Sequence, residues 1–179
     1  MKFIFDFDGV LFNAKEFIKF MYDYLEKTGT PRSITEEYYK KVGGTQFGLK
    51  EMLSHFSIDE SFYEKILNES PKFNNKELLD VVNKLGKENC YIVSHAKENW
   101  QRDKISKTGI GQYFSEIYVV SESKKGAVEA LCKKHEKETV VFVDDKAKYF
   151  ENLDFEKYPN LKTILYDDQG LEKLKREIK

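Results

Sequence analysis

The sequence predicts an α/β protein with a parallel five-stranded sheet flanked by helices and with a small all-helical cap. Three observations predict it. Short and almost continuously apolar segments recur along the chain, amphipathic helical patterns separate most of them, and one long stretch near the N-terminus shows helical patterns alone. Alternation of strands and helices is typical of parallel sheets with right-handed crossover connections.

The apolar segments are expected to form strands that are buried on both faces. They are short and rich in β-branched and aromatic residues, as strands of a parallel sheet are. Between them, apolar residues recur at helical spacing, for example Leu78, Val82 and Leu85. The sheet is therefore predicted to be Rossmann-like. Its five predicted strands are residues 2–7, 90–94, 117–121, 140–143 and 163–166.

The stretch from residue 14 to residue 71 carries no strand pattern and is predicted to be an insertion of four short helices. Ser33 with Glu36, and Ser57 with Glu60, match the capping-box pattern at the start of the second and fourth helices. The core is then 1–13 and 72–179. Because the insertion follows the first strand, it is expected to cover the carboxyl edge of the sheet, where ligand sites form. An ordinary surface subdomain is the alternative.

Composition and charge limit the classes of protein to which this chain can belong. The chain has 179 residues, of which 40% are hydrophobic and 34% charged, which indicates one globular domain with at most a small insertion. A net charge of −1 disfavours a nucleic-acid partner. No apolar stretch approaches the roughly 20 residues of a membrane span. Two cysteines without metal-ligand spacing fit a reducing compartment, so a cytoplasmic location is expected.

Two aspartates, Asp6 and Asp8, stand at the end of the first predicted strand and are followed by Gly9. Residues two apart in a strand point to the same side, and two carboxylates beside an apolar sheet repel each other and resist desolvation. A hard divalent cation removes that conflict. Gly9 allows a sharp turn and close approach to an anion. Helix capping is the alternative, but Asp6 lies too early for it.

A second acidic pair, Asp144 and Asp145, ends the predicted strand at 140–143. Ligand sites of open α/β sheets lie outside the carboxyl ends of the strands, so these acids are expected to meet Asp6 and Asp8. Carboxylates, water and substrate phosphate are a suitable set of oxygen ligands for Mg²⁺. N-capping of the following helix is the alternative for this pair.

A hydroxyl and two lysines complete the candidate site. Ser94 ends a third predicted strand and His95 follows it, where hydroxyls and exposed amides can bind phosphate oxygens. Lys124 and Lys125 precede Gly126 at the start of a predicted helix. A cation there can neutralise a carboxylate pair and a transferring phosphoryl group. The residues alone leave open which lysine does so.

Taken together, these motifs resemble the haloacid dehalogenase-like (HAD) superfamily. Residues 6–11 are similar to its first motif, Ser94 to the second, the lysine region to the third, and residues 144–145 to the fourth. Order and spacing agree over residues 1–13 and roughly 75–170. Residues 14–71 resemble the helical cap of the family, and 43–45 is weakly similar to its substrate-selecting cap loop.

The resemblance implies a role for each catalytic residue. Asp6 would be the nucleophile and form an aspartyl phosphate. Asp8 would protonate the leaving oxygen and later deprotonate the attacking water. Lys125 would stabilise charge between Asp6 and the phosphate, because a lysine followed by Gly126 looks more like the third motif. Lys124 stays the open alternative.

The resemblance also implies the binding residues. Ser94 and backbone amides near Gly9 and His95 would hold the phosphoryl oxygens. Mg²⁺ would be held by Asp6, the carbonyl oxygen of Asp8 and an acid of the fourth motif. Asp145 is expected to bind the ion directly, with Asp144 behind it.

The predicted function is therefore a magnesium-dependent phosphatase acting on a small phosphorylated metabolite or nucleotide. A phosphomutase shares the same motifs, and a noncatalytic phosphate-binding module would keep the pocket without turnover. Dehalogenase activity is disfavoured, because the dehalogenases of this family lack the second aspartate, which is Asp8 here.

Overall fold

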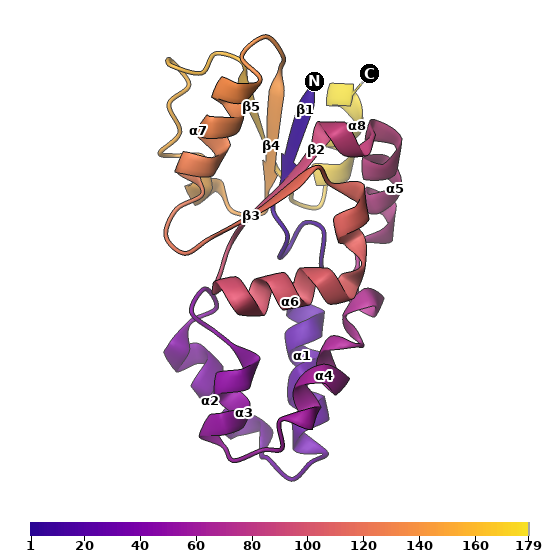
Figure 1. Ribbon diagram of the computed structural model, residues 1–179, viewed down its shortest axis with the longest axis vertical. Helices are drawn as coiled ribbons and strands as arrows, with labels where there is room; N and C mark the ends of the chain where they lie inside the picture. Colours follow the sequence, from indigo (N-terminus) through magenta and orange to yellow (C-terminus); the bar gives the residue numbers. More distant parts are fainter. Residues whose placement is uncertain (179) are drawn as a thin grey trace.

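The computed structural model describes residues 1–178 and is built around one five-stranded sheet (Figure 1). All neighbouring strands are parallel, in the order β3-β2-β1-β4-β5. Every observed strand overlaps one predicted segment, so the Rossmann-like α/β class is confirmed. The strands are β1 (Lys2–Phe5), β2 (Cys90–His95), β3 (Glu116–Val120), β4 (Val140–Asp144) and β5 (Leu161–Leu165).

Helices fill the connections between the strands. The α-helices are α1 (Ala14–Glu26), α2 (Arg32–Val42), α3 (Leu49–His55), α4 (Ser61–Leu67), α5 (Lys76–Leu85), α6 (Glu98–Thr108), α7 (Lys125–Lys134) and α8 (Gly170–Ile178). Short 3₁₀ helices are η1 (Ser70–Phe73), η2 (Lys87–Asn89), η3 (Ile110–Tyr113) and η4 (Ala147–Tyr149).

Two apolar clusters, one on each face, bury the sheet. Successive strand residues alternate between them, as the pleat requires. In β1, Phe3 and Phe5 join the cluster that contains Leu78 of α5, whereas Ile4 joins the cluster that contains Val128 of α7. Burial on both faces explains why the strands are continuously apolar in sequence. It also leaves the strand ends as the places where polar side chains can gather.

Helices α1–α4 lie together beyond α6, on the side of the sheet where β1, β2 and β4 end (Figure 1). Trp100 of α6 packs against these helices, because its ring centroid lies within 6.3 Å of the ring centroids of Phe17, Phe47 and Tyr63. Helix α6 therefore packs against the inserted helices although it follows β2. The division into a cap of residues 14–71 and a core of 1–13 and 72–179 stays a proposal.

Two helix starts differ from their predicted caps. Helix α2 begins at Arg32 directly after Pro31, so Ser33 lies inside the first turn and no side chain caps that helix. Helix α4 begins at Ser61, and the Asp59 carboxylate accepts a hydrogen bond from the Ser61 amide. Ser57 instead adopts a left-handed conformation in the preceding turn, with φ of 54°. Both capping-box predictions were wrong. Pro31 directly precedes the first residue of α2, and the Asp59 carboxylate binds the first amide of α4.

Among the described residues 1–178, no helix combines the length and the apolar character that crossing a membrane would need.

Both cysteine thiols, of Cys90 and Cys132, are buried and unpaired. Burial raises the pKa of Cys90 to about 12 and that of Cys132 to about 11. Because the thiolate is the reactive form, a raised pKa leaves little of it near neutral pH. We expect neither thiol of the native protein to react with a chromogenic disulfide reagent at about pH 8, and both to react in denaturant. Rapid reaction of either native thiol would contradict the packing.

Candidate active site

Three neighbouring strands bring the predicted motifs together at one edge of the sheet. Asp6 directly follows β1, Ser94 is the penultimate residue of β2, and Asp144 is the last residue of β4. The Asp6 amide donates to the carbonyl of Val143 at 2.9 Å, which extends the pairing of β1 with β4 beyond Phe5. This register places Asp6 beside Asp144.

Asp6, Asp144 and Asp145 form an acidic cluster, because oxygens of their carboxylates lie within 4.8 Å of one another. Asp6 and Asp144 are almost fully buried and Asp145 is half-buried. Burial raises the pKa of Asp6 against the opposing charge of Lys124, and Asp144 raises it further. Burial also raises the pKa of Asp145. The cluster therefore resists carrying three negative charges without an additional cation.

Lys124, not Lys125, is the lysine of this site. Its ammonium lies 2.8 Å from Asp6 Oδ1 and 2.6 Å from Asp144 Oδ2, and its side chain is 1% exposed. Burial lowers the pKa of Lys124, but the two carboxylates raise it by more, so the lysine stays charged. Lys125 points outward and donates to the Asn152 carbonyl at 2.7 Å. The preference for Lys125 was therefore wrong.

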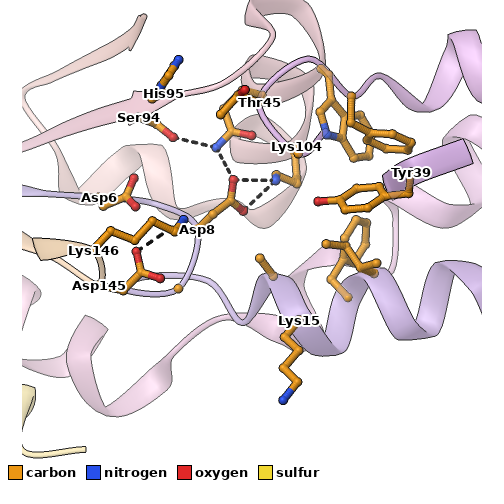
Figure 2. Close-up of a pocket in the computed structure, with 18 of the residues that line it drawn as sticks. Asp6, Asp8, Lys15, Tyr39, Thr45, Ser94, His95, Lys104, Asp145 and Lys146 are labelled. Atoms are coloured by element: carbon orange, nitrogen blue, oxygen red, sulfur yellow. Dashed lines mark hydrogen bonds and ion pairs between the residues drawn. The ribbon is translucent and has the colours of Figure 1, made fainter. Parts of the chain in front are cut away.

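The side chain of Asp8 lies outside the acidic cluster. Strand β1 ends at Phe5, so strand alternation does not continue to Asp8, and the expected sharing of one cation by two parallel carboxylates is wrong. The Asp8 carboxylate instead faces α6, where it pairs with Lys104 at 2.7 and 3.0 Å and accepts from Gln101 at 2.8 Å (Figure 2). Its carbonyl oxygen as a metal ligand stays a prediction.

Gly9 shapes the turn after Asp8 but does not offer its amide to a ligand. The amide donates to the carbonyl of Phe12 at 2.8 Å, so its predicted phosphate contact is not available in this conformation. Gly9 has φ of 90°, and a Cβ atom built on it would lie 2.5 Å from Asp145 Oδ2. Glycine is therefore required both for the backbone conformation and for the space that Asp145 occupies.

Replacing Gly9 with alanine should displace Asp145 and strain the turn. We expect a loss of about 1–3 kcal/mol in the free energy of unfolding, as for a non-glycine residue held at positive φ, together with weaker Mg²⁺ binding. Urea unfolding and a Mg²⁺ titration followed by thermal unfolding would measure both. The same substitution at Gly126, whose added Cβ meets no neighbour, is the matched control. Unchanged stability and Mg²⁺ response in the Gly9 variant would contradict this role.

Ser94 lies where a phosphate oxygen could meet it. It is 1% exposed by area but still lines the pocket, and its hydroxyl oxygen accepts a hydrogen bond from Gln101 at 2.8 Å. Because that oxygen is already an acceptor, the hydroxyl hydrogen is left to be donated to another group. The predicted phosphate contact of Ser94 fits this geometry and stays a proposal.

The ring of His95 is used within the protein. Nδ1 lies 3.0 Å from the Tyr149 hydroxyl and Nε2 lies 3.1 Å from the Ser121 carbonyl, and the ring points away from Asp6 and Asp8 (Figure 2). The Tyr149 ring in turn covers Lys124, whose ammonium lies 4.2 Å from the ring centroid. The His95 ring thus contacts Tyr149 and the Ser121 carbonyl instead of the pocket's carboxylates. The expected phosphate contact of a backbone amide near His95 stays a prediction.

These side chains surround one pocket with a volume of about 740 Å³. The strand ends line one side of it. Helix α2 and the loop before α3 line the other side with Tyr39, Thr45 and Phe47. In Figure 2 the Tyr39 hydroxyl points toward Asp8 and Lys104. The inserted helices thus contribute to the walls of the cavity that contains the acidic cluster.

Gln101, Lys104 and Tyr149 line the pocket and contact the predicted site residues, but they were not singled out from the sequence. A signal for the first two does exist. Positions 100, 101, 104, 105 and 108 lie on the buried face of α6, so a glutamine and a lysine stand where apolar residues are expected. Tyr149 lies in a short 3₁₀ helix, and no comparable pattern marks it.

A model described as haloacid dehalogenase-like hydrolase matches residues 3–152, which is most of the chain. The protein belongs to this family. Comparison with curated proteins finds no significant match.

Solved structures of HAD hydrolases share the fold of this family member. A haloacid dehalogenase-like hydrolase from Burkholderia xenovorans LB400 superposes with a TM-score of 0.69 at 14% identity, covering 94% of this chain and 86% of that one. A HAD hydrolase from Bacillus subtilis, bound to magnesium, gives 0.60 at 15%, covering 99% and 97%. The L-2-haloacid dehalogenase of Xanthobacter autotrophicus gives 0.50 at 18%, covering 99% and 81%. Identities this low establish the fold alone.

The residues of the cluster fit a magnesium ion by their donor chemistry. All of the clustered donors are carboxylate oxygens, which hard divalent cations prefer. Asp145 Oδ1 is buried and has no hydrogen-bond partner among residues 1–178, although the Lys146 ammonium lies 3.7 Å away. Both oxygens of Asp144 are engaged, by Lys124 and by the Lys146 amide. Asp145 is thus the better candidate for binding the ion directly. Asp144 would instead hold the groups around the ion in place.

Proposed function

We propose that this HAD hydrolase is a magnesium-dependent phosphatase that hydrolyses small phosphate monoesters through an aspartyl phosphate on Asp6. The observation that carries the proposal is the pairing of Asp6 with Lys124 inside an acidic cluster, with a second aspartate, Asp8, lining the same pocket. A nucleophile, a fixed cation and a separate proton-transfer group are what such a reaction requires.

In the first step an oxygen of Asp6 attacks phosphorus. Hydrogen bonds fix its Oδ1, because the Phe7 amide at 2.7 Å and the Lys124 ammonium at 2.8 Å both lie there. The carboxylate is therefore held with its other oxygen available for attack. As the P–O bond to the leaving group breaks, Asp8 gives its proton to the leaving oxygen. Lys124 and Ser94 stabilise the charge on the phosphoryl oxygens.

In the second step water attacks the phosphorus of the aspartyl phosphate. Asp8, now a carboxylate, takes the proton of that water, and the bond between Asp6 and phosphorus breaks. Inorganic phosphate is released and Asp8 is protonated for the next turnover. The second aspartate supports this chemistry over dehalogenation, which the fold alone also allows.

Magnesium, held by Asp6, Asp145 and the carbonyl oxygen of Asp8, would neutralise charge on the phosphoryl group. Asp144 would keep Lys124 and the loop that carries Asp145 in place, through its bonds to Lys124 and to the Lys146 amide.

The pocket supports a small substrate. Its volume of about 740 Å³ lies within the range of small-molecule sites, and residues of the inserted helices line the side opposite Asp6. A phosphorylated metabolite or a nucleotide fits this cavity. Activity confined to phosphoproteins would contradict that choice.

The test compares two products. We expect Mg²⁺-dependent release of phosphate from a panel of phosphate monoesters and no release of halide from L-2-chloropropionate. Halide release without phosphate release would overturn the proposal. Transfer of the phosphoryl group to a second hydroxyl, followed by ³¹P NMR, would indicate a phosphomutase. Binding of phosphate esters without turnover would indicate a binding module.

A further inference from the structure

Two buried polar side chains of α6, Gln101 and Lys104, bind the Asp8 carboxylate, and Gln101 also contacts Ser94. The Gln101 amide nitrogen lies 2.8 Å from Asp8 Oδ2 and 2.8 Å from Ser94 Oγ. The Lys104 ammonium lies 2.7 Å from Asp8 Oδ1 and 3.0 Å from Oδ2. Residues three apart share one face of a helix, so α6 presents both donors to the same carboxylate.

The direction of the Gln101 amide follows from its neighbours. A carboxylate only accepts hydrogen bonds, so the NH₂ group of Gln101 must face Asp8. Its two hydrogens are then divided between Asp8 and Ser94. The Ser94 oxygen is thereby fixed as an acceptor, and its own hydrogen is directed elsewhere. The carbonyl oxygen of Gln101 is buried without a hydrogen-bond partner in the described part of the chain, so the amide is oriented by these two contacts.

Lys104 is deeply buried for a lysine. Its side chain is 6% exposed, and its ammonium lies 5.3 Å from the ring centroid of Phe7, 5.4 Å from that of Phe12 and 5.5 Å from that of Trp100. Burial of a charge is costly unless it is paired. The Asp8 carboxylate supplies the pair. An apolar residue on this face of α6 would pack without that cost, so packing alone does not explain a lysine here.

We propose that Gln101 and Lys104 are positioning residues: both hold Asp8 for proton transfer to the leaving group, and Gln101 also turns the Ser94 hydroxyl toward the phosphoryl group. The inference rests on the proposed phosphatase function. When the Asp8 carboxyl gives its proton to the leaving oxygen, a carboxylate forms, and Lys104 and Gln101 bind that carboxylate in place. It then accepts the proton of the attacking water, so the proton balance closes in each turnover.

Leaving-group dependence separates this role from a purely structural one. An unactivated alkyl phosphate needs its leaving oxygen protonated, whereas p-nitrophenyl phosphate has a stable leaving group. In Lys104→Met and Gln101→Met we expect kcat/KM for an alkyl phosphate to fall by about 10²-fold or more, the contribution of general acid catalysis. For p-nitrophenyl phosphate the fall should stay below about tenfold. The readout is the ratio of kcat/KM for the alkyl phosphate to kcat/KM for p-nitrophenyl phosphate.

Lys107→Met is the matched control. Lys107 lies one turn further along α6 and pairs at the surface with Glu64 at 2.6 Å. We expect its ratio to equal that of the wild type. Thermal unfolding verifies that each variant is folded, and Gln101→Met carries the test if Lys104→Met does not fold. An equal fall for both substrates would overturn the positioning role alone. No phosphate release by the wild type would overturn the proposed function, and the inference with it.

Discussion

Replacing Asp6 with asparagine is expected to lower kcat for phosphate release by at least about 10³-fold, as loss of a nucleophile does in other hydrolases. Asparagine keeps the size of the side chain and an oxygen that accepts from the Phe7 amide. It lacks the second carboxylate oxygen and the negative charge that attack phosphorus. The variant should therefore stay folded and lose turnover. Steady-state kinetics with p-nitrophenyl phosphate at saturating Mg²⁺ would measure the loss.

The matched control for this variant is Asp80→Asn, on the exposed side of α5. It should keep the wild-type kcat. Substantial phosphate release by the Asp6 variant, with Asp80→Asn unchanged, would exclude Asp6 as the nucleophile. Because thermal unfolding of both variants is measured in parallel, a folding defect would be seen separately.

Replacing Lys124 with methionine is expected to reduce both stability and activity. The ammonium is the cation between two buried carboxylates, Asp6 and Asp144, which lie on either side of it at 2.8 and 2.6 Å. Removing one partner from a buried ion pair leaves uncompensated charge, which costs about 3–5 kcal/mol. Urea unfolding without divalent cations would measure this loss. Phosphate release should fall because the phosphoryl charge loses its fixed cation.

Lys125→Met is the matched control for Lys124→Met. The Lys125 ammonium pairs with Glu129 at 3.5 Å on the surface, and pairs of this kind contribute at most about 1 kcal/mol. Stability and kcat should stay close to the wild type. An inactive Lys125 variant beside an active Lys124 variant would contradict the geometry and restore the choice made from the sequence.

The sheet and the two acidic strand ends could be predicted because one physical pattern specifies both. Strands β1 and β4 are buried on both faces, so they appear in sequence as continuous apolar runs that stop where Asp6 and Asp144 begin. In a parallel sheet all carboxyl ends lie at one edge. The pairing of Phe5 with Val143 then brings the two acids together. No knowledge of side-chain packing is needed for this conclusion.

The choice between Lys124 and Lys125 depends on packing instead. Adjacent residues at a helix start differ in direction by about 100°. Helix α7 begins at Lys125, and Lys124 is its N-cap residue. The rotation of the helix as it packs against the sheet therefore determines which lysine points inward. Sequence spacing cannot specify that rotation at the first turn.

The surroundings of Asp8 were also beyond the sequence pattern. Its partners, Gln101 and Lys104, are more than ninety positions away, on a helix between the sheet and the inserted helices. Their type and spacing mark an unusual buried face, but only the tertiary structure shows that this face meets Asp8. The same holds for His95. Its ring contacts the Tyr149 hydroxyl, and no local sequence pattern specifies that contact.

Chemical trapping of the intermediate tests the central claim most directly. Borohydride reduces an aspartyl phosphate to homoserine, and peptide mass spectrometry then locates the modified residue. During turnover of p-nitrophenyl phosphate with Mg²⁺, we expect homoserine at position 6 and an unmodified Asp8. Homoserine at another aspartate, or turnover that leaves Asp6 unmodified under the same trapping conditions, would contradict Asp6 as the residue that carries the phosphoryl group.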